Sequence, residues 1–282
     1  MIETGFYPGC SLQGTSSEYA QSTLALARVF DIRFVDIPDW NCCGATAAHN
    51  CNHELALALP ARILALAEKQ GLTEIVVPCA ACYNRLNVAQ HELNNNKELK
   101  EQVSEIISMP VSGNILILNI MQFIEKYIAK KISEKIVKPF SKKVACYYGC
   151  LLVRPGNILK FDSVENPQSM DKLMQEIGSQ TIDWPFKTEC CGAGLSVSRT
   201  DLVGKLSGKI IGEALDRNAE AIIVACPMCH SNLDMRRPAI NRFLGLKTTI
   251  PVIYITQAIG MACGLSEAET GIRKHLVKVN IN

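Results

Sequence analysis

The chain has 282 residues, of which 48% are hydrophobic and 20% charged, enough apolar material for one large domain or two ordinary domains with packed cores. This composition excludes an intrinsically disordered chain. The net charge of +2, from 29 basic and 27 acidic residues, excludes a strong electrostatic field, so neither nucleic acid nor an anionic membrane surface is predicted as a partner.

The amino-terminal segment MIETGFYPGC lacks the basic region, apolar stretch and small-residue cleavage site of a signal peptide. We therefore expect a cytoplasmic protein. The most apolar segments, residues 115–124 and 219–225, are much shorter than the roughly 20 residues that cross a bilayer as a helix. No membrane span is predicted.

The first half of the chain alternates between helical and strand-like patterns. Residues 17–30 and 54–68 carry apolar side chains at helical spacing, and Pro60 predicts a kink in the second helix or its division into two shorter ones. The segment TEIVVP predicts a strand that runs directly into Cys79, and ILILNIMQFI at 115–124 predicts a short strand followed by a helix. The lysine-rich segment 126–143 is the predicted junction.

The second half repeats this order, with a helix predicted near 201–217, a strand at 219–225 that leads into Cys226, and a strand followed by a helix at 251–260. Alternation of strands and helices favours parallel sheets with helical cover. We therefore predict an α/β protein of two pseudo-symmetric, repeated α/β domains, each a short parallel sheet covered by helices. The predicted domains are residues 1–140 and 141–282.

Thirteen cysteines in a chain with no predicted export signal favour metal or redox chemistry over a disulfide framework, because the cytosol keeps thiols reduced. Ten of them belong to a pattern that occurs twice. The pattern consists of a single cysteine, then a CCG motif, then a CxxC motif. Flanking sequence repeats as well, since FYPGC matches YYGC and IVVPCAAC matches IVACPMC. The two sets are Cys10, Cys42, Cys43, Cys79 and Cys82, and Cys150, Cys190, Cys191, Cys226 and Cys229.

A CxxC motif alone leaves zinc, a redox dithiol and an iron-sulfur cluster open. Side chains of adjacent cysteines diverge, so the CC pair favours a polynuclear site over chelation of one atom. A structural zinc or a cubane cluster needs four protein ligands, whereas each half offers five thiols. Either one thiol of each set is not a ligand, or the cluster is larger or more open than a cubane and has a bridging cysteine.

The twofold pattern, together with the phrases CCGAG, CPMCH and PVIYITQAIGMACGLSEAETG, resembles the B-type subunit of heterodisulfide reductases, within the cysteine-rich CCG-domain family. The resemblance covers essentially the whole chain. It implies that each five-cysteine set, as named above, holds a noncubane [4Fe-4S] cluster. It further implies that a small disulfide is cleaved between the two clusters, with each sulfur captured by an iron.

The resemblance also implies two partners, a ferredoxin-like, C-type subunit and a flavin-bearing, A-type subunit. The sequence itself has neither the C-x2-C-x2-C-x3-C-P run of ferredoxins nor a glycine-rich dinucleotide fingerprint, so electrons are expected to arrive from another chain. The alternative is a non-catalytic electron-transfer iron-sulfur subunit of a lactate- or glycolate-type oxidoreductase complex. A third alternative is zinc in one half and a cluster in the other.

Three further features are candidates for a role at the cysteine site. His230 follows Cys229 and is a candidate proton donor to a departing thiolate, with a hydrogen-bonded structural histidine as the alternative. Gly44 and Gly192, which follow the CC pairs, predict either a close backbone approach to the inorganic core or a left-handed turn. For His49 and His53, the face of an ordinary helix is the favoured interpretation.

Cys51, Cys146 and Cys263 lie outside the repeated pattern and are expected to be buried free cysteines that pack as small hydrophobic residues. Cys146 is the exception to watch, because it stands four residues before Cys150. Its counterpart in the first half is Phe6.

Overall fold

Strands and helices alternate along the computed structural model, which describes residues 2–279 apart from the side chain of residue 49. The elements of the first half are β1 (Ile2–Phe6), α1 (Gly9–Gln13), α2 (Ser17–Val29), β2 (Ile32–Asp36), α3 (Ala48–Cys51), α4 (His53–Lys69), β3 (Glu74–Val77), α5 (Ala80–Asn95), α6 (Lys97–Ile107), β4 (Leu116–Asn119), α7 (Ile120–Tyr127) and α8 (Ala129–Lys135). Those of the second half are β5 (Lys143–Tyr147), α9 (Gly156–Leu159), α10 (Ser169–Glu176), β6 (Gln180–Thr181), η1 (Ala193–Leu195), α11 (Thr200–Asp216), β7 (Ala221–Val224), α12 (Pro227–Asp234), α13 (Arg237–Leu244), β8 (Val252–Tyr254), α14 (Ile255–Ala262), α15 (Glu267–Thr270) and η2 (Ile272–Lys274).

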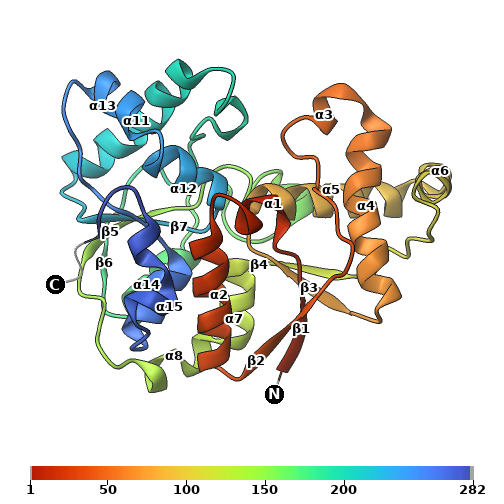
Figure 1. Cartoon of the computed structure of the whole chain (residues 1–282), viewed down its shortest axis with the longest axis horizontal. Coiled ribbons are helices and arrows are strands. Elements are labelled where there is room, and N and C mark those ends of the chain that lie inside the picture. The colour runs from red at the N-terminus through yellow and green to blue at the C-terminus, as the bar shows by residue number, and fades with distance from the viewer. Residues whose placement is uncertain (1, 280–282) are drawn as a thin grey trace.

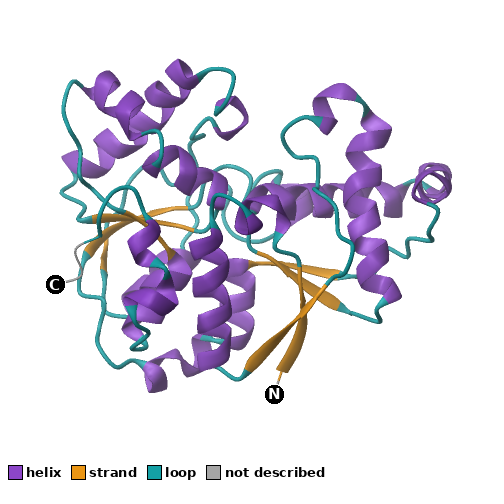
Figure 2. Ribbon diagram, viewed as in Figure 1, coloured by secondary structure: helices purple, strands orange, loops and turns teal. Residues whose placement is uncertain are grey.

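The eight strands form two four-stranded sheets with the same order, β2-β1-β3-β4 and β6-β5-β7-β8, and every pairing is parallel. The central strands β3 and β7 are fully buried and consist of apolar residues except Glu74, as expected of parallel strands covered on both faces. Helices flank each sheet (Figures 1 and 2). The predicted α/β class, the repeat and the parallel sheets are confirmed.

The helices predicted at 17–30, 54–68 and 201–217 correspond to α2, α4 and α11 within one residue at each end. The division of the second helix at Pro60 is wrong, because α4 runs unbroken from His53 to Lys69. Pro60 removes only one backbone N–H from the helix, and the buried residues on either side of it, including Leu57 and Leu64, hold the helix against the core.

The two halves share one hydrophobic core. A single cluster of buried residues runs from Phe6 in β1 to Ile272 in η2 and includes residues of both sheets. Helix α2 of the first half packs beside α14 and α15 of the second half (Figure 1). The boundary that we predict at residue 140 falls in the coil between α8 and β5, where the backbone N–H groups of Val137 and Lys138 both donate to Ala262 O.

Within residues 2–279, no helix combines the length and the apolar character that crossing a bilayer would require.

Candidate iron-sulfur site

Four cysteine segments lie at the carboxyl ends of parallel strands, and strands were predicted before two of them, those of Cys79 and Cys226. Cys10 and Cys150 follow β1 and β5, while the CxxC motifs follow β3 and β7. Cys79 and Cys226 cap the amino termini of α5 and α12 in extended conformation, so the second cysteine of each motif lies in the first helical turn. A helix start presents backbone N–H groups and the positive end of the helix dipole, which favour thiolates.

The sulfurs lie in pairs that repeat between the halves. Cys43 Sγ is 3.2 Å from Cys82 Sγ, and Cys191 Sγ is 3.7 Å from Cys229 Sγ at the equivalent place. Cys42 Sγ is 3.9 Å from Cys10 Sγ. In the described residues, no three His, Cys, Asp or Glu side chains surround a single ion-sized point. Together with contacts of Cys79 with Cys82, of Cys226 with Cys229 and of Cys150 with Cys190, these pairs group the ten predicted cysteines into two matching arrays.

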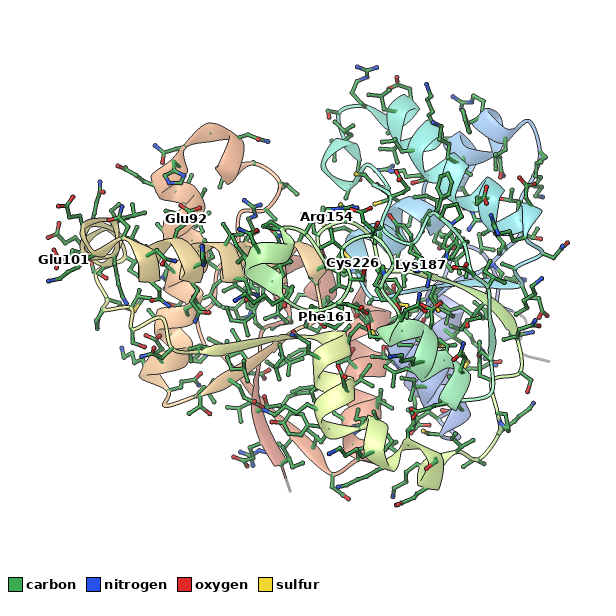
Figure 3. The ribbon with its side chains drawn as sticks, turned by 180° about the vertical axis from the view of Figure 1, so that it is seen from behind. Glu92, Glu101, Arg154, Phe161, Lys187 and Cys226 are labelled. Atoms are coloured by element: carbon green, nitrogen blue, oxygen red, sulfur yellow. The ribbon has the colours of Figure 1, made fainter. Side chains whose placement is uncertain are left out.

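The two arrays meet. Contact with the Cys226 thiol is the largest cause that raises the pKa of Cys79 above its ordinary value. The pKa of Cys226 is lowered, mainly by a hydrogen bond from Cys229 and next by the contact with Cys79. Figure 3 shows Cys226 at the centre of the molecule, between the helices of the two halves. A CxxC thiol of one array thus neighbours a CxxC thiol of the other.

Neighbouring thiols share protons, so one member of a pair ionises before its partner. Hydrogen bonds from Cys42 and then Cys82 lower the pKa of Cys43 to about 4, and a hydrogen bond from Cys150 lowers that of Cys190 to about 6. Gly192 N also donates to Cys190 Sγ at 3.3 Å. The same contacts raise the pKa of the partner thiols Cys42 and Cys150. Ligation needs the thiolate, so Cys43 and Cys190 are the members of these pairs that bind a metal most readily.

A glycine before the first cysteine of each set lets the backbone pass close to a sulfur. Gly9 has φ +66°, and a Cβ there would lie 3.1 Å from Cys82 Sγ; Gly149 has φ +71°, and its Cβ would lie 2.9 Å from Cys229 Sγ. This requirement was not predicted from the sequence. The signal that could have revealed it is the GC dipeptide that both copies share.

Gly44 and Gly192 adopt left-handed conformations, with φ +75° and +81°. A Cβ on Gly44 would meet Ala48 and Leu59, and one on Gly192 would meet Leu206 and Val203, all at the helices that follow. The left-handed turn predicted at both positions is confirmed. The contacts show tight packing against helices at these two glycines.

Two buried tyrosines hold the CC loops in the same way in each half. Tyr7 Oη donates to Asn41 O at 2.8 Å, and Tyr147 Oη donates to Glu189 O at 2.6 Å. Each acceptor residue immediately precedes a CC pair. This role was not predicted, although a tyrosine occurs at the same place in both repeats.

Tyr19 of α2 joins the two CxxC segments at the contact between the halves. Its hydroxyl lies 3.4 Å from Pro78 O and 3.2 Å from Ala225 O, the carbonyls directly before Cys79 and Cys226. Its ring stacks on Tyr254 of the second half, with centroids 4.0 Å apart. No repeated motif marks this residue, so comparison of the two halves in sequence did not find it.

His230 follows Cys229 in α12, and its ring is buried. Its Nε2 is 3.1 Å from Val252 O, and the ring stacks on Tyr254 with centroids 4.3 Å apart. Burial and then the neighbouring His275 lower its pKa well below the ordinary value. These contacts are those of a hydrogen-bonded structural histidine, and the role of proton donor stays a prediction.

The cysteines outside the pattern differ from one another. Cys146 is buried in β5, where burial raises the pKa of its thiol and its carbonyl accepts from Trp184 Nε1 at 3.1 Å. Cys263 is half-buried, and Cys51 is exposed, so the expectation of a buried Cys51 is wrong. Cys51 ends the one-turn helix α3, which lies outside the core.

The predicted helix-surface role fits His53, which is exposed and lies 3.3 Å from Glu92 Oε2. The side chain of His49 lies outside the described residues.

A cavity of about 540 Å³ opens beside the two arrays. Its wall includes Ser11, which follows Cys10, and Met228, which lies between the cysteines of the second CxxC motif. The loops after the CC pairs contribute Thr46 and Gly194. Asn232 connects this wall to the second array, since its Nδ2 donates to Cys191 O at 3.0 Å and contacts Cys191 Sγ at 3.8 Å.

Comparison with known proteins places both halves in one family. The family model of the cysteine-rich CCG domain matches residues 4–87 and again residues 144–234. The two matches include all ten cysteines of the repeated pattern.

Curated relatives match over nearly the whole length of both chains. The 8-methylmenaquinol:fumarate reductase membrane anchor subunit of Wolinella succinogenes is 29% identical over 98% of this chain and 97% of the relative. The B-type subunit of the ferredoxin/F420H2-dependent CoB-CoM heterodisulfide reductase of Methanosarcina acetivorans is 30% identical over 99% of this chain and 95% of the relative. Relatives of this kind indicate an iron-sulfur protein that transfers electrons within a complex.

Among solved structures, a hypothetical protein from Helicobacter pylori superposes with a TM-score of 0.79 over 99% of this chain at 14% identity. The chain spans 52% of that protein. This likeness is one of fold.

Proposed function

Because the chain belongs to the cysteine-rich CCG-domain family, which includes the B-type subunit of heterodisulfide reductases, we propose that it is the disulfide-handling subunit of a heterodisulfide reductase-type complex. Each five-cysteine set holds one noncubane [4Fe-4S] cluster in this proposal. A small disulfide is cleaved, or formed in the reverse direction, between the two clusters. The complex acts in the cytoplasm.

The proximity of the two CxxC segments carries this proposal, since Tyr19 Oη lies 3.4 Å from Pro78 O and 3.2 Å from Ala225 O, directly before Cys79 and Cys226. Two centres that act on one sulfur–sulfur bond must lie next to each other, and this proximity supports such an arrangement. Ten thiols in two matching arrays also suit the donor set of two iron-sulfur cores. Gly9 and Gly149 support the fit, because a side chain at either place would press on a ligand sulfur.

Cleavage of the disulfide breaks one sulfur–sulfur bond, takes up two electrons and two protons, and releases two thiols. When bound, each cluster supplies one-electron chemistry, so two of them suit a two-electron bond. The electrons come from the ferredoxin-like, C-type subunit, which receives them from the flavin-bearing, A-type subunit. The chain's own residues position the sulfurs, and the cavity that Ser11 and Met228 line receives the disulfide.

The direct test is anaerobic purification with measurement of iron and acid-labile sulfide, followed by electron paramagnetic resonance with added thiol. We expect about eight irons per chain and a signal that changes when thiol is added. About four irons would leave one cluster and contradict the paired reaction. Zinc in place of iron in one half would favour the mixed-metal alternative.

Substitution of single ligands gives the matching control. Cys82→Ser and Cys229→Ser should each lose about half of the iron and abolish disulfide turnover, because each removes one ligand from one array. Cys51→Ser, which changes an exposed cysteine outside both arrays, should keep all of the iron. Turnover that persists with one cluster missing would refute the reaction between two clusters.

The Wolinella relative favours a second candidate, an iron-sulfur subunit that passes electrons to a partner oxidoreductase without handling a disulfide. A lactate- or glycolate-oxidising complex belongs to the same class. Thiol titration separates the two candidates: an electron-transfer protein of this kind should be reduced and reoxidised with no change of its paramagnetic signal on addition of thiols.

A further inference from the structure

A second cavity, of about 720 Å³, lies at the end of the second sheet opposite to the cysteine arrays. Its wall includes Lys142, Glu220 and Pro251, the residues that directly precede β5, β7 and β8. Cys150 and Cys226 follow the carboxyl ends of two of these parallel strands, so the length of the sheet separates this cavity from the arrays. Its volume is of the size that holds a small molecule.

The wall of this cavity has more positive than negative side chains. Its described residues include four cations and two carboxylates: Lys142, Arg237, Lys247 and Lys278, with Glu220 and Asp234. None of the six takes part in an ion pair within the described chain. Both carboxylates accept backbone hydrogen bonds instead, Glu220 Oε2 from Lys143 N at 2.7 Å and Asp234 Oδ2 from Leu276 N at 2.8 Å. The wall therefore carries an excess of two positive charges.

Arg237 is the buried cation of this set, with 7% of its surface exposed. Its Nη1 donates to Thr248 Oγ1 and its Nη2 to Ile250 O, both at 3.0 Å, and its Nε has no partner. Each Nη group keeps one further N–H, because a guanidinium has five N–H donors. Burial lowers the pKa of Arg237 more than the charge of Asp234 raises it, and a buried cation without a paired anion is costly. An anionic ligand in the cavity supplies the missing partner.

The first half of the chain has a neutral residue at the equivalent position. Gln90 and Arg237 each stand eleven residues after the first cysteine of their CxxC motif. Gln90 Nε2 donates to Ile115 O at 2.8 Å, and Arg237 Nη2 makes the matching contact with Ile250 O in the second half. A neutral amide thus suffices to hold the helical segment to the chain before the last strand of the sheet. This structural contact does not account for the positive charge of Arg237.

We propose that this cavity binds an organic phosphate monoester, with its phosphate group against Arg237 and the lysines. A phosphate monoester is close to a dianion at neutral pH, which matches the excess of two positive charges. Arginine binds phosphate through parallel N–H donors and lysine binds it as a point charge. Met235 and Leu276 of the same wall are 41% and 65% exposed, so apolar surface is available to cover the organic part of the ligand. The inference is independent of the proposed function, because the cavity lies away from the arrays.

The test is isothermal titration calorimetry of the full-length protein, purified anaerobically and kept at fixed ionic strength. Four probes are titrated: AMP, 3′,5′-cyclic AMP, inorganic phosphate and adenosine. We expect AMP to have the lowest dissociation constant. Inorganic phosphate, which lacks the apolar contact, and cyclic AMP, a monoanion with the same organic part, should each bind about ten-fold more weakly. Adenosine, which has no anionic group, should give no heat of binding.

Arg237→Gln gives the second half the residue that the first half has at this position. It should weaken AMP binding about ten-fold or more, because charge-assisted hydrogen bonds are lost, while the iron content and circular dichroism stay the same. Lys247→Gln changes an exposed residue of the wall, which the fold does not depend on, and should weaken AMP binding a few-fold. Arg242→Gln removes the same charge from an exposed arginine of α13 outside the cavity wall and should bind AMP as the wild type does.

Absence of binding by both AMP and inorganic phosphate would overturn the inference. AMP affinity that is unchanged in Arg237→Gln and Lys247→Gln, or that falls equally in Arg242→Gln, would also contradict it. Equal affinity for AMP and adenosine would indicate a nucleoside site, and AMP that binds no more tightly than inorganic phosphate would exclude the organic ester. Iron content and the response to thiols test the proposed function separately.

Discussion

Single glycines let the backbone pass close to the cysteine sulfurs, and the approach is tightest at Gly149. Gly149→Ala should lose about half of the iron, because its new Cβ would lie 2.9 Å from Cys229 Sγ. Gly245→Ala is the control for the backbone strain of a side chain at φ +71°, because Gly245 has φ +69° and a Cβ there would meet no heavy atom within 4 Å. Iron analysis and circular dichroism measure the result. Full iron in Gly149→Ala, or equal loss in Gly245→Ala, would contradict the steric explanation.

Tyr19 gives a second prediction at this scale. Tyr19→Phe keeps the stack on Tyr254 but removes the hydroxyl that lies near Pro78 O and Ala225 O. We expect a loss of about 1 kcal/mol in the free energy of unfolding, together with a changed magnetic interaction between the two clusters, since both CxxC segments lose a common anchor.

The control for this change is Thr256→Val. It removes another buried hydrogen bond between the halves, in which Thr256 Oγ1 lies 2.7 Å from Ser22 Oγ, and it changes no residue of either CxxC segment. It should lower stability by a similar amount and leave the magnetic interaction unchanged. If Tyr19→Phe alters stability alone, Tyr19 has only a structural role.

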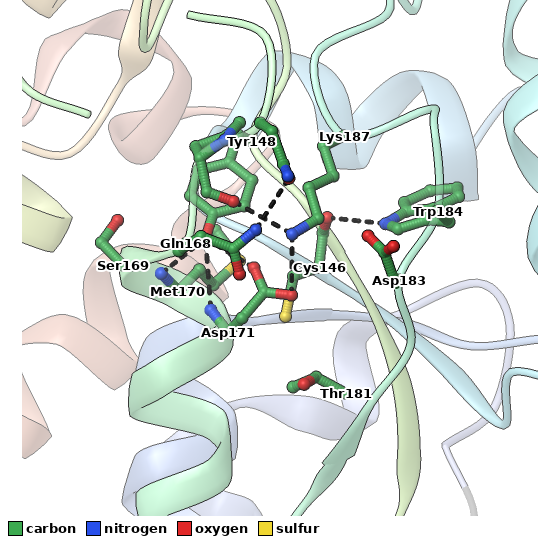
Figure 4. A network of polar contacts seen from close by, with 12 residues as sticks. Cys146, Tyr148, Gln168, Ser169, Met170, Asp171, Thr181, Asp183, Trp184 and Lys187 are labelled. Carbon is green, nitrogen blue, oxygen red and sulfur yellow. Dashed lines mark hydrogen bonds and ion pairs between the residues drawn. The ribbon is translucent and has the colours of Figure 1, made fainter. Parts of the chain in front are cut away.

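At the scale of elements, a buried ion pair fixes the loop before Cys150. Lys187 Nζ donates to Asp171 Oδ1 at 3.1 Å, and Asp171 Oδ2 accepts from Tyr148 Oη at 2.7 Å (Figure 4). Lys187 O accepts from the backbone N–H of Tyr148 and of Gly149. The network therefore joins α10 to the segments that carry Cys150 and Cys190.

Lys187→Met should lower the free energy of unfolding by about 3 kcal/mol, because it leaves the carboxylate of Asp171 buried without its cation. Denaturant titration of the apo protein measures this. Lys187→Met combined with Asp171→Leu should recover part of the loss. Arg199→Gln breaks the exposed pair with Asp201 and should change stability by less than about 0.5 kcal/mol. An equal effect of the buried and the exposed changes would refute the argument.

Helices and strands with a clear spacing of apolar residues were predictable from the sequence. Elements whose formation depends on tertiary contacts were not. Apolar spacing located α2, α4 and α11, and apolar runs located β3 and β7. β6 has only two residues, Gln180 and Thr181, and owes its place to β5 rather than to its own pattern. The ten cysteines were predictable from the repeat, whereas Tyr19 contacts the carbonyl of Ala225 in the other half, 206 residues away, which a pattern within one half does not reveal.

The whole molecule behaves as two copies of one unit with a common interior. Helix α2 of the first half packs on α14 of the second, and one apolar cluster includes both sheets. Burial of this kind couples the halves thermodynamically, since neither sheet keeps its full cover without the other. The whole chain, and not each repeat, is therefore the expected unit of folding.

The chain offers a direct test, because its two tryptophans lie in different halves: Trp40 packs against Tyr7, and Trp184 against Tyr147. Trp184→Phe leaves a fluorescent reporter in the first half, and Trp40→Phe leaves one in the second. In each apo variant we expect the remaining tryptophan and far-ultraviolet circular dichroism to report the same denaturant midpoint, as a single cooperative transition requires. A tryptophan transition that precedes the loss of helix signal in either variant would show that the halves unfold independently, and the shared core would then be too weak to couple them.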